Sequence, residues 1–286
     1  GFWRGSDHHG TPISDGNGGS TDSPHRNACH RSDEAWPFQI DLPGITGAAT
    51  IGELVDGQDQ RLDFHLLACS GAITANVLHP SNPGAVRQWG EQTQIGRGFL
   101  NDDTTLVTLT VGGNDVGFGP IIKDCLLYSL ATLATPESAY CDELPRPDGQ
   151  SSTTYGQWVQ GNLDSLGGKI EDVLQDIHSS APSARIVMLG YPTLFESGSG
   201  CVSIDPVNMT WLNGIAVQLN SVLTAAASAA GSHVTYQSPQ YLFEGSNLCA
   251  DPTAVNSLVF AQTPGEAPNF SFPVPGPNFN VNVSQQ

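Results

Sequence analysis

The stretch Leu106-Val-Thr-Leu-Thr-Val-Gly-Gly-Asn-Asp-Val-Gly-Phe118 decides the fold of this chain. It opens on a mostly β-branched or apolar run, which predicts a buried strand over about 105–111. Gly112 and Gly113 then turn the backbone, so that Asn114 projects from the carboxyl end of the strand. Ligands of open α/β sheets bind at that edge. An amide side chain fixed there, beside glycines that let a substrate approach closely, is suited to donating a hydrogen bond to a developing oxyanion.

The same residues also suit a tight strand-to-loop turn, in which Asn114 and Asp115 make local Asx hydrogen bonds. Taken alone, this segment leaves both interpretations open. A second segment, Asp63-Phe-His-Leu-Leu-Ala-Cys-Ser-Gly-Ala72, favours the oxyanion interpretation. It reads as another short apolar strand, over about 63–69, that ends in a turn of small residues. The backbone N–H of Gly71 would then be available to the same oxyanion.

The Cys-Ser-Gly-Ala turn followed by Gly-Gly-Asn-Asp-Val-Gly-Phe resembles the SGNH (GDSL-type) hydrolases. The resemblance is closest to the secreted, disulfide-containing esterases and lipases of actinobacterial type. Cys29-His-Arg-Ser-Asp-Glu-Ala-Trp-Pro37 is also similar to the family's Cys-x-Arg-Ser…Ala-Tyr-Pro stretch, with Trp36 in place of tyrosine. The resemblance runs from about Cys29 to the end of the chain.

The resemblance implies an oxyanion hole made by the Gly71 N–H, the Asn114 side chain and the N–H of the nucleophile. Ser70, Gly113 and Asp115 would then border the substrate, with Asp115 bracing the Asn114 loop. It further implies a three-layer α/β/α flavodoxin-like fold with a parallel sheet, as a single domain over 1–286. The expected activity is carboxylic ester hydrolysis, of the esterase or lipase type, through a serine acyl-enzyme that needs no cofactor or metal. Acyl lipids, phospholipids and acetylated polysaccharides all suit such an enzyme.

Two catalytic blocks of the family have no counterpart in this sequence. No Gly-Asp-Ser occurs, and no histidine follows His233. We therefore expect both ends of the chain to stop short of the catalytic Ser and His blocks. Ser6 could imitate a nucleophile beside a histidine, but no apolar strand precedes it. Two alternatives stay open: a non-catalytic SGNH-like binding module that has lost its nucleophile, and an unrelated α/β carbohydrate-binding protein.

Composition limits the classes of partner. The 286 residues, 38% hydrophobic, are enough for a single core. A net charge of −18 with only ten Lys plus Arg argues against nucleic acid and anionic membranes as partners. No apolar stretch approaches the length of a membrane span. We expect a monomer whose partner is the ester substrate, with no stable membrane insertion.

Six cysteines occur without any Cys-x-x-Cys pair, which predicts disulfides rather than zinc, and therefore secretion to an extracellular location. No metal site is expected, because the histidines among the first thirty residues match no ligand spacing. Six cysteines allow fifteen connectivities, and free buried thiols are the alternative. The resemblance implies sequential pairing, as Cys29–Cys69, Cys125–Cys141 and Cys201–Cys249.

The remaining pattern alternates helices and strands, which predicts a parallel sheet covered by helices. We expect a loop or disorder over 1–28, a crossover of loop and helix over 76–101, a long excursion over 117–152, helices over 155–179 and 207–230, strands over 184–190 and 233–237, and an extended loop over 263–280.

Overall fold

The computed structural model describes residues 29, 31, 35–42, 49–88, 91–132, 140–146, 153–196, 204–248, 250, 270–273 and 280–283. The chain forms two compact units, and each is described by itself. Unit 1 comprises Gly1–Phe99, Gln262–Pro268 and Gln285–Gln286, and unit 2 comprises Leu100–Ala261 and Asn269–Ser284. The expectations for 1–28, including Ser6, lie outside the described residues, and the single domain over 1–286 stays a prediction.

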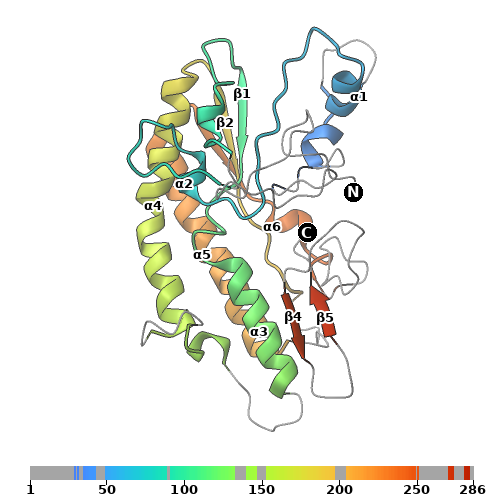
Figure 1. Ribbon diagram of the computed structural model, residues 1–286, viewed down its shortest axis with the longest axis vertical. Helices are drawn as coiled ribbons and strands as arrows, with labels where there is room; N and C mark the ends of the chain where they lie inside the picture. The colour runs from blue at the N-terminus through green and yellow to red at the C-terminus, as the bar shows by residue number, and fades with distance from the viewer. Residues whose placement is uncertain are drawn as a thin grey trace. The chain divides into compact units, whose positions relative to one another are not determined.

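A parallel three-stranded sheet organises unit 2. The strands β1 (Leu106–Leu109), β2 (Arg185–Leu189) and β3 (Val234–Gln237) lie in the order β1-β2-β3, and Figure 1 shows β1 beside β2. The central strand pairs Ile186 with Val107 on one side and with Val234 on the other. The expected α/β class with a parallel sheet is confirmed, together with the three strands predicted near 105–111, 184–190 and 233–237.

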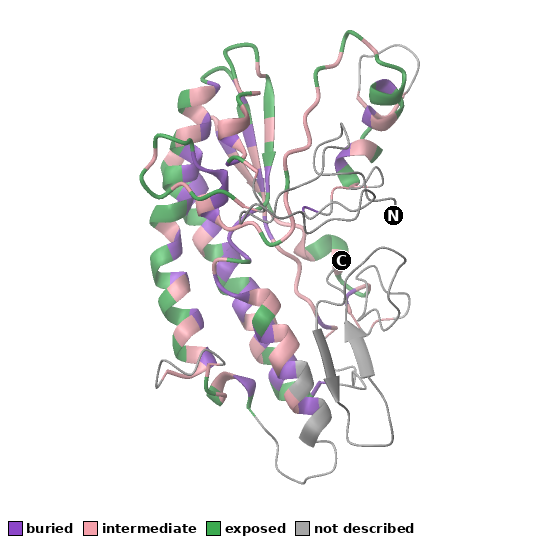
Figure 2. Cartoon of the chain, viewed as in Figure 1, coloured by how far each residue is buried: buried purple, intermediate pink, exposed green. Residues whose placement is uncertain are grey.

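Two long helices pack beside each other in this unit, as Figure 1 shows. Helix α4 (Tyr155–Ser180) begins at a capping box between Thr154 and Gln157, and α5 (Pro206–Ala230) begins at Asp205, whose side chain accepts from the Val207 N–H. Apolar residues three and four apart form the buried stripe of α4 (Figure 2). Its buried members are Tyr155, Val159, Leu163, Leu166, Ile170, Val173, Leu174 and Ile177. The helices predicted over 155–179 and 207–230 are confirmed to within one residue at each end.

The exposed face of α4 includes two glycines at which a side chain would have open space. A Cβ added to Gly161 or Gly168 would meet no atom within 4 Å, and both residues are exposed. Packing therefore does not require glycine at these two positions of α4, although glycine disfavours the helical conformation there.

Two predictions about elements are wrong, those for 63–69 and for 263–280, and the excursion over 117–152 contains helices that were not predicted. The residues 63–69 form no strand: they run as an irregular segment of unit 1, and none of the described residues pairs with them in a ladder. The excursion after the glycine turn contains the helix α3 (Phe118–Thr132) and a short η3 (Cys141–Glu143). The expected loop over 263–280 includes β4 (Phe270–Pro273), which pairs antiparallel with β5 (Asn280–Val283).

Unit 1 has short elements in its described part. They are η1 (Trp36–Gln39), α1 (Ile51–Asp56), α2 (Thr74–Val77) and η2 (Ile95–Arg97). The last two fall in the predicted stretch of loop and helix over 76–101 or at its edge. With so little regular structure, we expect side-chain contacts and the disulfide to hold much of this unit together.

Disulfides join Cys29 to Cys69 in unit 1 and Cys125 to Cys141 in unit 2. Both pairs are those that the family resemblance implies, and Cys125 and Cys141 are almost fully buried. Cys201 and Cys249 lie outside the described residues. Within the described part of the chain, none of the helices combines the length and the hydropathy that crossing a membrane requires.

Candidate active site

The turn after β1 holds Asn114 at the carboxyl edge of the sheet. Gly112 has φ of +109°, a conformation that favours glycine, and an added Cβ there would come within 3.3 Å of the Leu166 side chain. Three backbone bonds of 3.1 Å close the turn: Val116 donates to Gly112, Gly117 to Asn114, and Phe118 to Gly113. Asn114 itself is exposed. The turn therefore fixes the backbone of Asn114 and leaves the residue accessible to a ligand.

A second loop of the sheet contacts this turn. The Gly113 N–H donates a 3.0 Å hydrogen bond to the hydroxyl of Tyr191, which lies two residues beyond the end of β2. Burial of the phenol raises the pKa of Tyr191 to about 12; the Gly113 hydrogen bond opposes this rise and the negative charge of Asp115 adds to it. Tyr191 therefore stays protonated at neutral pH and is not a general base there. The sequence analysis did not single out Tyr191.

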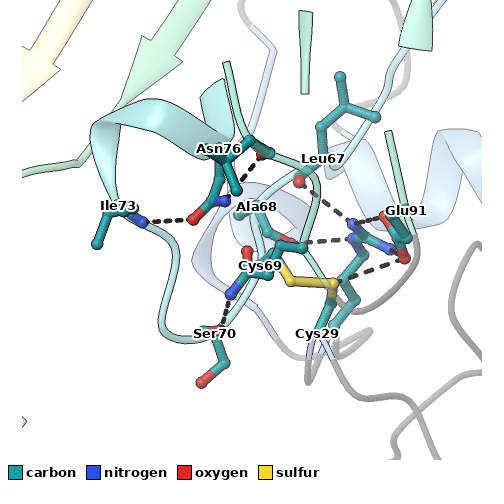
Figure 3. The surroundings of a disulfide bond; sticks show 11 residues. Cys29, Leu67, Ala68, Cys69, Ser70, Ile73, Asn76 and Glu91 are labelled. Carbon is teal, nitrogen blue, oxygen red and sulfur yellow. Dashed lines mark hydrogen bonds and ion pairs between the residues drawn. A yellow bond between two sulfur atoms is a disulfide. The ribbon is translucent and has the colours of Figure 1, made fainter. Parts of the chain in front are cut away.

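In unit 1, the turn that carries Gly71 is tied to Cys29 and to Gln88 by three bonds. Cys69 is bonded to Cys29, the Ser70 N–H donates to the Cys29 carbonyl at 3.0 Å, and Gln88 Nε2 donates to the Ser70 carbonyl at 2.8 Å (Figure 3). Gly71 is exposed, with φ of +75°. Its backbone is therefore held in a conformation that favours glycine.

The guanidinium of Arg31 holds the segment that leads into this turn. It forms a bidentate ion pair with Glu91 at 2.9 and 2.8 Å, in which each side chain is only 10% exposed. The same guanidinium donates to the carbonyls of Ala68, at 2.9 Å, and Leu67, at 3.3 Å. Figure 3 shows these bonds meeting beside the disulfide. The Arg31 guanidinium, paired with Glu91, thus holds the backbone at Leu67 and Ala68. This backbone forms no β-ladder with the other described residues.

Helix α6 (Gln240–Phe243) follows β3 at the same carboxyl edge of the sheet. Its Tyr241 is 70% exposed and its Leu242 is 67% exposed. These are the two most exposed large hydrophobic side chains among the described residues, and they can contact an apolar part of a ligand.

The described histidines are engaged in structural contacts. The rings of His178 and His233 stack with centroids 4.0 Å apart, at the end of α4 and just before β3. The ring of His65 stacks on Phe99 and its Nε2 lies 2.9 Å from Asp63. Among the residues that the structure describes, no group of three or more His, Cys, Asp or Glu could hold a metal ion.

The predicted site residues fall in both units. Ser70 and Gly71 belong to unit 1, and Gly113, Asn114 and Asp115 belong to unit 2. A common oxyanion hole from Gly71 and Asn114 therefore stays a prediction. No sequence pattern singles out Tyr191 or Glu91. Arg31 lies in the Cys-x-Arg-Ser resemblance at Cys29, but its hydrogen bonds to the 67–68 backbone were not predicted.

Comparison with known proteins gives matches over most of the chain. Residues 27–248 match the model of the GDSL-like lipase/acylhydrolase family. Lipase 1 of Streptomyces coelicolor is 30% identical over 199 residues, which are 68% of this chain and 60% of that protein. A lipase of Streptomyces rimosus is 26% identical over 250 residues, which are 87% of this chain and 75% of that protein. The chain thus spans less than two thirds of the length of the first of these relatives.

Solved structures share the fold. The crystal structure of phospholipase A1 from Streptomyces albidoflavus NA297 superimposes with a TM-score of 0.59 and 26% identity, covering 88% of this chain and 86% of that one. An extracellular lipase from Streptomyces rimosus superimposes with a TM-score of 0.56 at 22% identity, covering 88% and 85%. The second likeness supports the fold alone.

Proposed function

The chain belongs to the GDSL-like lipase/acylhydrolase family, and from this premise we propose that the protein hydrolyses carboxylic esters through a serine acyl-enzyme. The serine would attack the ester carbonyl and generate a tetrahedral oxyanion. The Asn114 side chain and the Gly71 N–H would stabilise this oxyanion, together with the N–H of the nucleophile. No cofactor or metal takes part in this chemistry.

The observation that carries the proposal is the arrangement around Asn114. The residue is exposed at the carboxyl end of a parallel strand, on a turn closed by three backbone hydrogen bonds. A donor held in place before the reaction begins does not lose stabilisation to reorganisation as the oxyanion forms. As the family resemblance implies, Gly113 and Ser70 would border the substrate, and Asp115 would brace the Asn114 loop.

The substrate is an ester with an apolar acyl chain in this proposal. The exposed Tyr241 and Leu242 lie on α6, which follows the carboxyl end of β3, and their apolar surface would gain free energy on contact with such a chain. Acyl lipids and phospholipids are therefore preferred over acetylated polysaccharides. We propose that the protein is secreted, because the two disulfides suit an oxidising compartment, and that it acts as a monomer.

Replacing Asn114 with alanine in the full-length protein tests the proposal. Hydrolysis of short p-nitrophenyl esters should lose about 10²–10³-fold in kcat, the effect of removing one oxyanion donor. Asn101→Ala is the matched control, since Asn101 is exposed in the turn that precedes β1 at the opposite edge of the sheet. An unchanged kcat for Asn114→Ala would remove Asn114 from the site. Binding of esters by the full-length protein without any turnover would favour the non-catalytic module instead.

A further inference from the structure

Tyr191 connects the body of unit 2 to the residue that precedes Asn114. Its hydroxyl accepts the Gly113 N–H at 3.0 Å, across a separation of 78 residues in sequence. The N–H of Gly113 is thereby bonded to the side chain of the neighbouring loop, while the carbonyl of Gly113 closes the turn with Phe118. The phenol therefore decides where the peptide next to Asn114 lies.

The backbone of Tyr191 is itself held from both sides by one amide of α5. The Tyr191 N–H donates to Asn220 Oδ1 at 2.8 Å, and Asn220 Nδ2 donates to the Tyr191 carbonyl at 2.7 Å. Asn220 is only 6% exposed. A tyrosine whose backbone is fixed has two side-chain torsions left, so that its hydroxyl is well placed for a distant partner.

The surroundings of Tyr191 are closely packed. A Cβ added to Gly113 would lie 3.0 Å from two ring carbons and the hydroxyl oxygen of Tyr191. A Cβ added to Gly190 would collide with the Tyr236 hydroxyl and would lie 2.6 Å from Asn220 Oδ1. The Tyr191 side chain therefore lies directly against the Gly113 backbone, and the Tyr236 hydroxyl lies close to Gly190.

We propose that Tyr191 is the positioning residue for Asn114 in ester hydrolysis. The inference rests on the proposed function. An oxyanion donor acts only when it lies about 2.7–3.1 Å from the oxyanion, and small misplacements of a catalytic group lower the rate steeply. Without the hydroxyl, the Gly113 N–H loses its partner and the turn that holds Asn114 can shift. Tyr191 acts through Asn114, and its raised pKa keeps the phenol in the protonated form throughout the neutral range.

The experiment compares Tyr191→Phe with a matched control in the full-length protein. Tyr236→Phe makes the same chemical change at a buried hydroxyl on β3 that has no hydrogen-bond partner among the described residues. With p-nitrophenyl butyrate, Tyr191→Phe should lower kcat about tenfold, as expected when a misplaced donor loses part of its effect. KM should stay within about twofold, because the tyrosine does not bind the substrate in the ground state. Tyr236→Phe should keep the original kcat.

Amide hydrogen exchange gives a readout that does not depend on activity. The Gly113 amide should exchange faster in Tyr191→Phe and should be unchanged in Tyr236→Phe. A purely structural loss would instead accelerate exchange across the sheet and lower the melting temperature along with kcat. Slow exchange at Gly113 in Tyr191→Phe would overturn the proposal.

A double mutant separates this inference from the proposed function. If both act through one donor, adding Tyr191→Phe to Asn114→Ala should lower kcat by less than twofold, far from the product of the two single effects. A large loss for Asn114→Ala with none for Tyr191→Phe would overturn the role of Tyr191 and leave the proposed function standing. No loss for Asn114→Ala would overturn both.

Discussion

Arg31 holds the 67–70 segment by side-chain hydrogen bonds where a strand would use backbone ones. The segment was predicted as part of a strand because it is short, apolar and followed by small residues. A strand also needs a ladder partner, and the identity of that partner is not encoded in the segment itself. The ion pair of Arg31 with Glu91 spans 60 residues, so that no local pattern could reveal it.

Removing Arg31 should destabilise the fold strongly. Arg31→Leu leaves Glu91 as an uncompensated charge that is 10% exposed, which costs about 3–5 kcal/mol for a buried pair. Urea unfolding of the chain measures the loss. Arg61→Leu is the control, because Arg61 pairs with Asp59 at the surface, where the arginine side chain is 53% exposed and solvent screens the pair so that it adds little stability. Equal losses in the two variants would contradict the clamp role of Arg31.

The stacked pair of His178 and His233 should make stability depend on pH. Burial lowers the pKa of His233 below 6.5, and the positive charge of His178 lowers it further. Well above pH 6.5 the imidazole is neutral in both the folded and the unfolded chain, so its protonation does not lower the unfolding free energy there. As the pH falls below 6.5, the unfolded chain binds the proton more readily, and the folded state loses stability.

Melting temperatures between pH 7.5 and pH 5.5 test this dependence. His233→Gln should lose less stability over this range than the unchanged protein. His79→Gln, which removes an exposed imidazole from a loop of unit 1, is the matched control. The interpretation fails if His233→Gln and the unchanged protein have parallel profiles.

At the scale of elements, the sequence predicts those helices and strands whose apolar spacing is visible within the segment itself. Helix α4 and strand β2 were predicted because their apolar spacing is a property of the segments themselves. Helix α3 was missed because Phe118-Gly-Pro-Ile-Ile-Lys-Asp-Cys-Leu-Leu is apolar without a clear period and has Pro120 in its first turn. The pairing of β4 with β5 was missed because it joins two segments of the proline-rich tail that show no strand pattern of their own.

The carboxyl edge of the sheet illustrates the same division for the site. Asn114 was predicted because two glycines directly after a strand are a local signal. Tyr191 and Asn220 were not, because their contacts with the Asn114 turn and with each other cross 78 and 29 residues of sequence. An asparagine in the mostly apolar sequence of α5, such as Asn220, is a sequence signal that could have indicated a loop held by a side chain.

Helix α6 should set the preference for acyl-chain length. Changing both Tyr241 and Leu242 to serine removes two exposed apolar side chains, each of which gains about 1.5–3 kcal/mol when fully buried. With partial burial on an acyl chain, the ratio of activity on p-nitrophenyl dodecanoate to that on the acetate should fall about tenfold, which corresponds to 1.4 kcal/mol. Leu106→Ser is the control, at the opposite edge of the sheet and 54% exposed. An unchanged ratio in the double variant would exclude α6 from acyl binding.

At the scale of the whole molecule, net charge and disulfides dominate. The charge of −18 creates self-repulsion that folding must overcome, and covalent bridges offset part of it by limiting the unfolded chain. The pairing of Cys29 with Cys69 and of Cys125 with Cys141 followed from the family resemblance rather than from cysteine spacing, which left fifteen connectivities open.

Peptide mapping without reduction should find three bridges, including Cys201–Cys249. Replacing Cys125 and Cys141 by alanine should cost about 3 kcal/mol of unfolding free energy, the chain-entropy value for a loop of about 15 residues; the two cysteines are 16 apart. Replacing Cys29 and Cys69, which are 40 apart, should cost about 1 kcal/mol more. Urea unfolding of the two double variants checks this order. A crossed pairing, or six titratable thiols, would contradict the assignment.

Substitution of the two open glycines of α4 could raise the thermal stability of this protein. Gly161 and Gly168 occupy helix interior positions where a methyl group would meet nothing within 4 Å. Alanine at each would restrict the unfolded chain and favour the helix by about 0.4–1 kcal/mol, with no change to the carboxyl edge of the sheet. Gly113 and Gly190 offer no such freedom, because a methyl group there would displace Tyr191 or Tyr236. Selection for function at elevated temperature should therefore accept alanine on the helix and reject it at the strand ends.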